Sequence, residues 1–436
     1  MTKMKKVAVI GDWHLAFVTS AVLADVGHDV TLVKPLHLNS QTWTGKFPPT
    51  PVVEINLPEM IEKNVAAGRL HYQNGITTDL QAEIIWMAID TPVSDKDEPQ
   101  LEPLLQVADE IGRLKTKPGV FAVSSQIPLT FSFELQKRSG VSVVYIPENL
   151  RLGKGIETFF AADRTVLGSD DPKAAQAVQE LMANFKTEFL VCNLVTSEMV
   201  KHANNAFLAT SISFSNELAR IAEKFGVDSV TVGKALKLDK RIGQAAYVIP
   251  GLGFAGGTLP RDLRVLQNLA RKTGTPSQLV DAVLDVNENT TAAISETVHD
   301  YIAKNNLPKT VLVLGYTYKA ETDTLRRSLS IDIANILKAK GYEVIGYDPM
   351  MNGKDLSAIK GIIEHCPTMS DIKTNISVTL LMTARPTFKE FDWSKIKGQA
   401  GQQLVFDTQN FLNGAEINQA GFLYKRLWSP MAGGSK

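Results

Sequence analysis

The chain has 436 residues, which is too long for one compact core and typical of two or three domains. Lysine plus arginine and aspartate plus glutamate both number 46, so no overall charge favours nucleic acid or a membrane surface as a partner. The only two cysteines, Cys192 and Cys366, exclude a disulfide framework and a four-cysteine zinc site. No apolar run approaches the roughly 20 residues that span a bilayer, and the N-terminus lacks a signal-peptide pattern, so we expect a cytoplasmic protein.

Two stretches of the chain show the same predicted order of elements. The first has the apolar run Lys5–Gly11, an apolar helical stretch and a second apolar run at residues 29–34. The second has Lys309–Gly315, a helical stretch over residues 328–341 and the run Glu343–Pro349. Strand, glycine turn, helix and strand form the opening unit of a doubly wound parallel sheet. The repeat predicts two nucleotide-binding folds in one chain.

Further short apolar runs extend both predicted sheets. They are Glu83–Ile89, Val120–Ser125 and Val141–Pro147 after the first unit, and Val378–Thr383 and Gln403–Thr408 after the second. Continuous apolar strands separated by helices indicate parallel sheets that are covered on both faces.

The stretch between the two units is expected to be helical over Ser197–Gly226, where apolar residues have helical spacing, and from Thr275 to Leu307, beginning after Pro276. We therefore predict an α/β protein with two Rossmann-like doubly wound domains joined by a long central helix. The expected domains are a dinucleotide-binding domain at 1–196, a central helical region at 197–304 and a C-terminal Rossmann-like domain at 305–436.

Motifs in several parts of the chain resemble one family. The similar segments are residues 197–219 (SEMVKHANNAFLATSISFSNELA), Tyr145–Glu157, Leu238–Gly243, Pro250–Leu263 and Gly315–Ser328. In sequence and order they resemble the UDP-glucose/GDP-mannose dehydrogenase family, the NAD-dependent nucleotide-sugar 6-dehydrogenases. The resemblance implies two hydride transfers that convert a sugar C6 alcohol to a carboxylate, with a cysteine thiolate that traps the intermediate aldehyde.

The resemblance also implies a set of catalytic residues. Glu148 matches the glutamate of the family's PEF/PEN loop, Lys201 and Asn205 match the lysine and asparagine of the central helix, and Asp262 matches the aspartate of the PKD triplet. Lys201 and Asn205 are four residues apart, so they share one face of a helix.

Two of the expected catalytic positions depart from the family. Thr258 stands where the family has its nucleophilic cysteine, and Gln126 stands where it has a catalytic threonine. A threonine hydroxyl is a poor nucleophile without a dedicated base. Cys192 and Cys366 are expected to be small buried hydrophobes elsewhere in the fold. We therefore expect no covalent thioester step.

The predicted cofactor-binding turn also departs from the expected sequence pattern. The GxGxxG fingerprint is replaced by GDWHLA, in which Trp13 takes the place of the second glycine and should either obstruct the pyrophosphate or point away from it. Lys34 replaces the strand-end acid; it either favours the 2′-phosphate of NADP or is an exposed lysine. The resemblance implies NAD, with NADP as an open alternative. The expected cofactor contacts are Gly11, Trp13, His14, Leu15, Lys34, Thr91 and Lys319.

The predicted substrate site is closer to the family pattern. Its glycine-rich loop lets backbone approach a ligand, and a lysine and an arginine of the second unit match those on the family's uridine diphosphate side. Arg241 resembles the arginine that a dimer partner contributes, whereas Gln409 stands where many members have an arginine. The expected contacts are Leu150, Arg241, Tyr247, Gly251, Phe254, Gly256, Gly257, Lys319 and Arg326.

The apolar central helix and its small residues Ala206, Ala209 and Thr210 lead us to expect a homodimer. We expect no metal and no nucleic acid or membrane partner. The favoured function is a UDP-sugar oxidoreductase that transfers one hydride, or that oxidises the hydrated aldehyde without a covalent step. The alternative is a catalytically silent UDP-sugar-binding paralogue that acts as a sensor or partner subunit. A third possibility is reversible oxidation during epimerisation.

Overall fold

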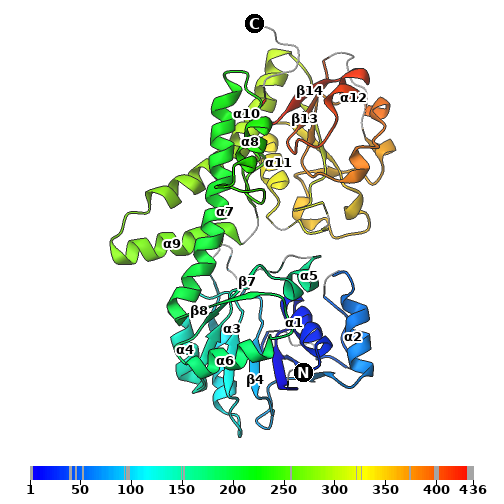
Figure 1. Ribbon diagram of the computed structural model, residues 1–436. Helices are drawn as coiled ribbons and strands as arrows, with labels where there is room; N and C mark the ends of the chain where they lie inside the picture. The colour runs from blue at the N-terminus through cyan, green and yellow to red at the C-terminus, as the bar shows by residue number, and fades with distance from the viewer. Residues whose placement is uncertain are drawn as a thin grey trace. The chain divides into compact units, whose positions relative to one another are not determined.

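The computed structural model describes residues 3–38, 42–44, 47–51, 54–92, 94, 99–148, 150, 153–255, 258–320, 322–325, 327–372, 375–396 and 402–429. The chain divides into two compact units, Met1–Asn204 and Asn205–Lys436 (Figure 1). Each unit contains its own sheet and its own core.

The first unit is a doubly wound α/β layer. Within its described residues the sheet has eight strands in the order β3-β2-β1-β4-β5-β6-β7-β8. Neighbouring strands run parallel, except that β6 and β7 pair antiparallel between Tyr145 and Gly168. The strands are β1 (Lys6–Ile10), β2 (Asp29–Lys34), β3 (Leu70–Asn74), β4 (Ile84–Met87), β5 (Val120–Val123), β6 (Val143–Tyr145), β7 (Arg164–Gly168) and β8 (Glu188–Cys192). The helices are α1 (His14–Asp25), α2 (Leu57–Ala66), α3 (Glu102–Gly112), α4 (Phe131–Ser139), α5 (Gly155–Phe160) and α6 (Pro172–Leu181). The order 3-2-1-4-5-6 is that of dinucleotide-binding sheets.

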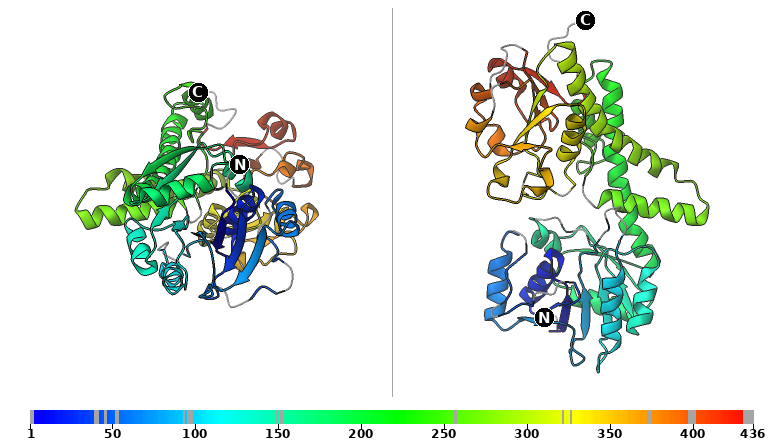
Figure 2. Two further views of the ribbon diagram at one scale, coloured as in Figure 1. Left: turned by 60° about the horizontal axis from the view of Figure 1, so that its bottom comes forward. Right: turned by 180° about the vertical axis from the view of Figure 1, so that it is seen from behind.

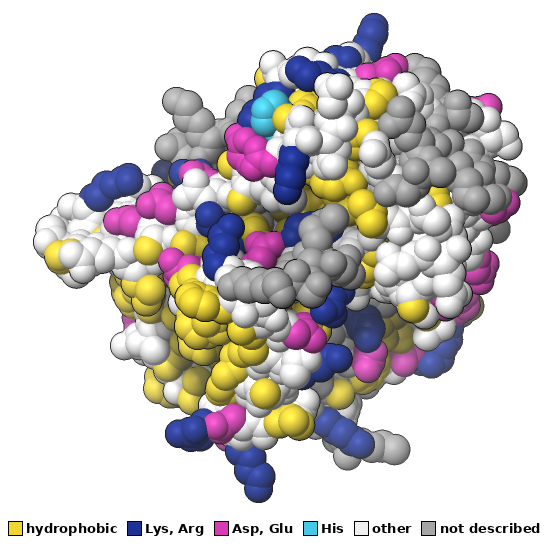
Figure 3. Space-filling view, turned by 90° about the horizontal axis from the view of Figure 1, so that it is seen from above, with side chains coloured by type: hydrophobic (Ala, Val, Ile, Leu, Met, Phe, Trp, Pro, Cys, Tyr) yellow, Lys and Arg dark blue, Asp and Glu magenta, His cyan; other side chains and the backbone are white. Residues whose placement is uncertain are grey.

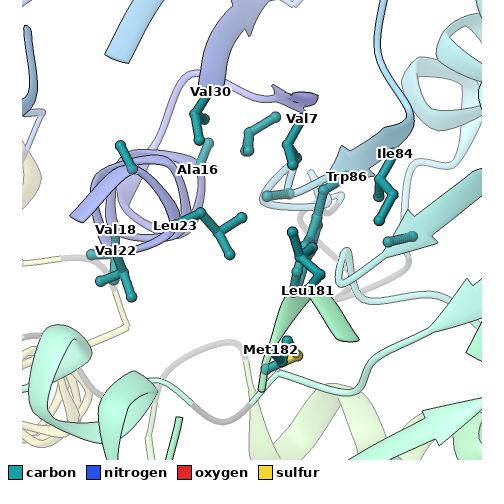
Figure 4. Packing of buried hydrophobic residues seen from close by; sticks show 14 of the residues in the cluster. Val7, Ala16, Val18, Val22, Leu23, Val30, Ile84, Trp86, Leu181 and Met182 are labelled. Atoms are coloured by element: carbon teal, nitrogen blue, oxygen red, sulfur yellow. The ribbon is translucent and has the colours of Figure 1, made fainter. Parts of the chain in front are cut away.

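Two cores cover the two faces of this sheet. On one face, α1 packs its almost wholly apolar surface against β1 and β4, and Figure 4 shows Leu23 of this helix near Val7 and Trp86 of the strands. The indole of Trp86 is 2% exposed and donates to the Ser124 hydroxyl at 2.9 Å. On the other face, α3 and α4 pack against each other over a second apolar cluster. The turn between β1 and α1 is therefore held between two buried layers.

The second unit has a smaller parallel sheet. Its described strands lie in the order β11-β10-β9-β12-β13-β14, and all of the neighbouring pairs are parallel. The strands are β9 (Thr310–Leu314), β10 (Glu343–Tyr347), β11 (Glu364–His365), β12 (Val378–Leu381), β13 (Leu404–Asp407) and β14 (Leu423–Arg426). The helices are α8 (Ser229–Leu238), α9 (Leu259–Thr273), α10 (Gln278–Lys304), α11 (Leu329–Ala339) and α12 (Gly414–Gln419), with short 3₁₀ turns at Pro349–Met351, Ser357–Ile359, Met369–Asp371, Pro386–Phe388 and Trp393–Ile396.

One long helix, α7 (Leu194–Glu223), begins in the first unit and ends in the second. In the second unit, α9 packs against α10, and Figure 2 shows these two helices from behind. Gly274, with φ of +67°, ends α9 in the left-handed conformation that glycine adopts without strain. Within the described part of the chain, no helix has the length and apolar character that crossing a membrane requires.

The predicted fold class is confirmed, with differences in detail. The predicted central helix starts at Leu194, three residues before the expected Ser197. The sequence analysis did not predict β3, β7, β11 or β14, which are short or carry polar residues. The expectation that both cysteines are buried is correct for Cys366 and wrong for Cys192, which is only partly buried at the end of the half-exposed strand β8.

Candidate active site

The turn between β1 and α1 can receive an anion. A β-carbon at Gly11 would lie 2.6 Å from the carbonyl oxygen of Ala88, so only glycine allows the turn to pass this close to β4. The first turn of α1 carries no acidic side chain, and among the described residues no side chain caps its N-terminus. Its N–H groups therefore remain suited to a phosphate. Trp13 is 43% exposed, so its indole lies at the surface of the protein.

The ribose end of this turn differs from a usual NAD site. Lys34, at the end of β2, is 2% exposed, so the alternative that it is an exposed strand-end lysine is wrong. Its ammonium lies 5.6 Å from the centre of the Trp43 ring. Burial raises the pKa of Asp12, whereas the positive charge of Lys34 acts in the opposite direction. Lys34 thus offsets the negative charge that Asp12 brings into the phosphate-binding turn.

Several candidate residues follow the carboxyl ends of β4, β5 and β6. The Thr91 hydroxyl donates to the backbone carbonyl of Gln126 at 2.6 Å, which joins the loops after β4 and β5. Glu148 follows β6, and its carboxylate accepts a hydrogen bond from the backbone N–H of Leu150. Ligands of open parallel sheets bind at this carboxyl edge. The edge of the first unit therefore brings together four predicted site residues.

Lys201 on α7 contacts the loop that carries Glu148. The ammonium of Lys201, which is 8% exposed, donates to the backbone carbonyl of Glu148. Burial raises the pKa of Glu148, and the positive charge of Lys201 lowers it by a smaller amount. A carboxyl group with a raised pKa is a stronger base once it is ionised.

Asn205 and Asp262 meet in the second unit. The Asn205 amide donates to a carboxylate oxygen of Asp262, which is fully buried on the first turn of α9. Thr258, the residue at the expected nucleophile position, is the exposed N-cap residue of the same helix. The carboxylate of Asp262 therefore accepts a hydrogen bond from the amide of Asn205. Thr258 lies four residues before Asp262 along the chain.

Neither cysteine has the environment of a nucleophile. Burial raises the pKa of the Cys192 thiol, which disfavours the thiolate. The Cys366 thiol donates to the backbone carbonyl of Asp371 at 3.5 Å inside the second unit. Within the described residues, no group of three or more His, Cys, Asp or Glu side chains is arranged to hold a metal ion.

The predicted substrate loop is held by two asparagines. The Asn216 side chain of α7 accepts from the backbone N–H of Gly251 at 2.8 Å. The Asn287 side chain of α10 accepts from the backbone N–H of Phe254 at 2.8 Å and donates to its carbonyl at 3.0 Å. Phe254 is buried and Tyr247 is 44% exposed. The predicted contacts Gly256 and Gly257 lie outside the described residues.

The remaining predicted contacts of the second unit are more scattered. Arg241 is exposed and pairs with Asp239 at 2.6 Å. Lys319 follows β9, with its ammonium 5.3 Å from the ring centre of Tyr318. The Gln409 amide donates to the carbonyl of Met382 at 2.8 Å. Arg326 lies outside the described residues.

A buried ion pair between Arg385 and Asp348, which the sequence analysis missed, organises the loop that carries Lys319. The Arg385 guanidinium lies 2.9 Å from Asp348 and also donates to the Thr317 hydroxyl and to the carbonyls of Ala320 and Thr322. Asp348 in turn accepts from the backbone N–H of Thr317 at 3.2 Å. In the sequence, Asp348 was visible as an acidic residue at the end of the predicted strand Glu343–Pro349. Its partner Arg385 could not be predicted, because it follows a different strand, β12.

Comparisons with known proteins agree along the whole chain. Models of the UDP-glucose/GDP-mannose dehydrogenase family match in order: its NAD binding domain at residues 5–186, its central domain at 195–289 and its UDP binding domain at 312–414. The UDP-glucose 6-dehydrogenase TuaD of Bacillus subtilis (strain 168) is 30% identical over 442 residues, which cover 99% of this chain and 95% of that protein. YwqF, a UDP-glucose 6-dehydrogenase of the same strain, is 29% identical and covers 96% of each chain. A UDP-glucose dehydrogenase structure from Pyrobaculum islandicum has a TM-score of 0.83 at 24% identity over 98% of both chains and has the same fold.

The Arg385–Asp348 pair generates a stability prediction. We expect Asp348→Asn to lower the free energy of unfolding by about 3–5 kcal/mol, because it leaves a buried guanidinium without its counter-charge. Chemical denaturation measures this loss. The matched control is Glu296→Gln, which breaks the exposed 2.5 Å pair with Lys340 in the same unit and should change stability little. Equal effects of the two substitutions would contradict the assigned importance of the buried pair.

Proposed function

The chain belongs to the UDP-glucose/GDP-mannose dehydrogenase family, and we propose that it oxidises the C6 alcohol of a UDP-sugar with NAD by hydride transfer, without a thioester intermediate. The observation that carries the proposal is the hydrogen bond from the Lys201 ammonium to the backbone carbonyl of Glu148, a residue whose pKa burial raises, at the carboxyl edge of the first sheet. Family relatives that are named UDP-glucose 6-dehydrogenases support the substrate class.

The β1–α1 turn supports the cofactor. Gly11, His14 and Leu15 would hold the pyrophosphate at the start of α1, and Thr91 would line the loop after β4. NAD supplies the hydride acceptor when it is bound. The pyrophosphate end of the site fits the group, because the helix N-terminus carries no acidic residue in its first turn. At the ribose end Lys34 replaces the usual acid, so NADP is the second cofactor to test.

The chain's own residues would manage the proton and the developing negative charge. Oxidation removes a hydride from C6 and a proton from the hydroxyl group. The ionised Glu148 would accept this proton, directly or through a water molecule. The Lys201 ammonium and the Asn205 amide, one turn apart on α7, would stabilise the negative charge that develops on the oxygen.

The fate of the aldehyde follows from Thr258. A threonine hydroxyl has no sulfur with which to form a thioester, and without an adjacent base it is a poor nucleophile for the aldehyde, so we expect no bond to the enzyme. The aldehyde is then either the product or adds water to form a geminal diol. A second hydride transfer from this diol, with loss of one hydroxyl proton, would give the carboxylic acid. The acid would lose one more proton to become the carboxylate. Gln126 would hydrogen-bond the water or the substrate oxygen.

We also propose a homodimer through α7. The exposed side chains of Phe207, Phe214 and Ile221 recur every seven residues, at 72%, 52% and 56% exposure, and form one apolar stripe along the helix. Figure 3 shows hydrophobic side chains gathered at the surface of one face of the molecule. An exposed apolar stripe of this kind is typical of an interface between proteins.

The direct test of the function is a single-turnover reaction at high protein concentration with a panel of UDP-sugars and either NAD or NADP. We expect reduced nicotinamide together with a product of aldehyde or carboxylate mass, and we expect the same result from the double variant Cys192→Ser, Cys366→Ser. Loss of turnover in the double variant would contradict the thiol-free route. UDP-sugar binding with no reduction of either cofactor would support the catalytically silent alternative.

The raised pKa of Glu148 predicts a pH dependence. The hydride step needs the carboxylate, so its rate should rise with pH through a pKa above the value of about 4.3 for an exposed glutamate.

The raised pKa of Glu148 also predicts how stability depends on pH. Because the folded-state pKa is raised, the contribution of Glu148 to stability is full below its unfolded pKa and is lost as pH rises through the folded value. Glu148→Gln should therefore remove this ascending limb and gain stability relative to wild type at higher pH. A single-turnover pH profile and melting temperatures at two pH values test both effects, and an unchanged profile in the variant would exclude Glu148 as the base.

The apolar stripe predicts the oligomeric state. Phe214→Asp should convert the dimer to a monomer in sedimentation experiments, because it places a charge in the middle of the apolar stripe that dimerisation would bury. Lys272→Asp, which introduces the same residue on the exposed surface of α9, is the control and should leave the dimer intact. A monomeric wild-type protein would refute the proposed interface.

A further inference from the structure

Glu54 is a buried carboxylate that the proposed mechanism does not use. It lies between β2 and α2, outside any helix or strand, and its side chain is 1% exposed. One carboxylate oxygen accepts from the backbone N–H of Gly153 at 2.8 Å and lies 2.7 Å from Nε2 of His14. The other oxygen accepts from the backbone N–H of Gly155 at 2.8 Å. Groups from two distant parts of the chain, His14 on one side and Gly153 and Gly155 on the other, thus converge on one carboxylate.

The first of these groups belongs to the predicted cofactor turn. His14 is the first residue of α1, and its side chain is 8% exposed. The contact with Glu54 fixes the imidazole next to the N–H groups of the first helical turn. A buried carboxylate orients the imidazole ring that it contacts, as in other carboxylate–histidine pairs.

The other two groups follow Glu148 along the chain. Gly155 is the first residue of α5, and α5 packs against α1 (Figure 1). A β-carbon at Gly155 would lie 3.1 Å from Cε1 of the His14 ring and 3.3 Å from Val18, so the start of α5 is fitted closely to the imidazole. A positive charge on His14 acts to lower the pKa of Glu148, which places these two groups within electrostatic reach.

We propose that Glu54 is a positioning residue that ties His14, at the start of α1, to the start of α5, and so couples dinucleotide binding at the β1–α1 turn to the segment that follows Glu148. This inference rests on the proposed function. Two ends of one active site, the phosphate-binding turn and the neighbourhood of the proposed base, would share a single buried carboxylate. A dinucleotide that settles on the α1 turn would then also stabilise the Glu148 side of the site.

The conservative variant Glu54→Gln breaks this arrangement without changing the size of the side chain. A carboxamide has one acceptor oxygen and one NH₂ group. At least one of the three partners of Glu54 would therefore face the NH₂ group in place of a carboxylate oxygen. The matched control is Glu198→Gln. Glu198 is also fully buried in the first unit and accepts from the backbone N–H groups of Thr130 and Ser132, but at the start of α4, which packs on α3.

The experiment titrates the full-length wild type and both variants with NADH by fluorescence and with UDP by calorimetry. We expect Glu54→Gln to weaken NADH binding roughly ten- to hundredfold, the effect of losing a hydrogen bond to a charged group, and to leave UDP binding unchanged. In turnover, the KM for NAD should rise while the KM for the UDP-sugar stays constant. Glu198→Gln should leave both affinities unchanged, even if it lowers the melting temperature. Equal NADH affinities of Glu54→Gln and wild type, or equal losses in both variants, would overturn the proposal.

A ligand-free measurement separates this inference from the proposed function. If the wild type itself binds no NADH, the proposed function fails, and amide hydrogen exchange still tests the coupling. We expect Glu54→Gln to accelerate exchange in α5 and in the first turn of α1 together, with no such change in Glu198→Gln. Faster exchange in α5 alone would overturn the proposed link between the two segments.

Discussion

A parallel sheet brings the carboxyl ends of its strands to one edge, and the candidate site of the first unit depends on this constraint. The loops after β1, β4, β5 and β6 supply Gly11, Thr91, Gln126 and Glu148 in turn. None of these residues is close to the others in sequence. The strand order and the buried helix α1 alone bring them to the same edge.

Charge compensation recurs where ionisable groups are buried. Lys201 donates to the carbonyl of Glu148, Lys34 offsets Asp12, and Arg385 pairs with Asp348. Burial raises the pKa of Glu148 by more than the positive charge of Lys201 lowers it, and a raised pKa suits a base. In the second sheet, Asp348 at the end of β10 forms a buried ion pair with Arg385. The two Rossmann-like units therefore share one topology but use their strand-end positions differently.

The sequence predicted the fold and many site residues because both depend on local patterns. Apolar runs and glycine turns predicted the two sheets, and the helix motif predicted that Lys201 and Asn205 lie on one face of α7. The same patterns could not predict the burial of Lys34, because Trp43, whose ring lies near its ammonium, belongs to no helix or strand. Glu54 was missed for the same reason: its partners Gly153 and Gly155 are about a hundred residues away, and no local spacing links them.

We infer that this chain moves a hydride from a UDP-sugar to a dinucleotide, although Thr258 stands at the position where we expect the family's cysteine. The most direct measurement uses a UDP-sugar that carries two deuterium atoms at C6, incubated with NAD, with mass spectrometry of the nicotinamide product. We expect one deuterium in each reduced cofactor and the loss of one deuterium from the sugar for each hydride transferred. A bound sugar that keeps both deuterium atoms while the cofactor stays unlabelled and oxidised would contradict it.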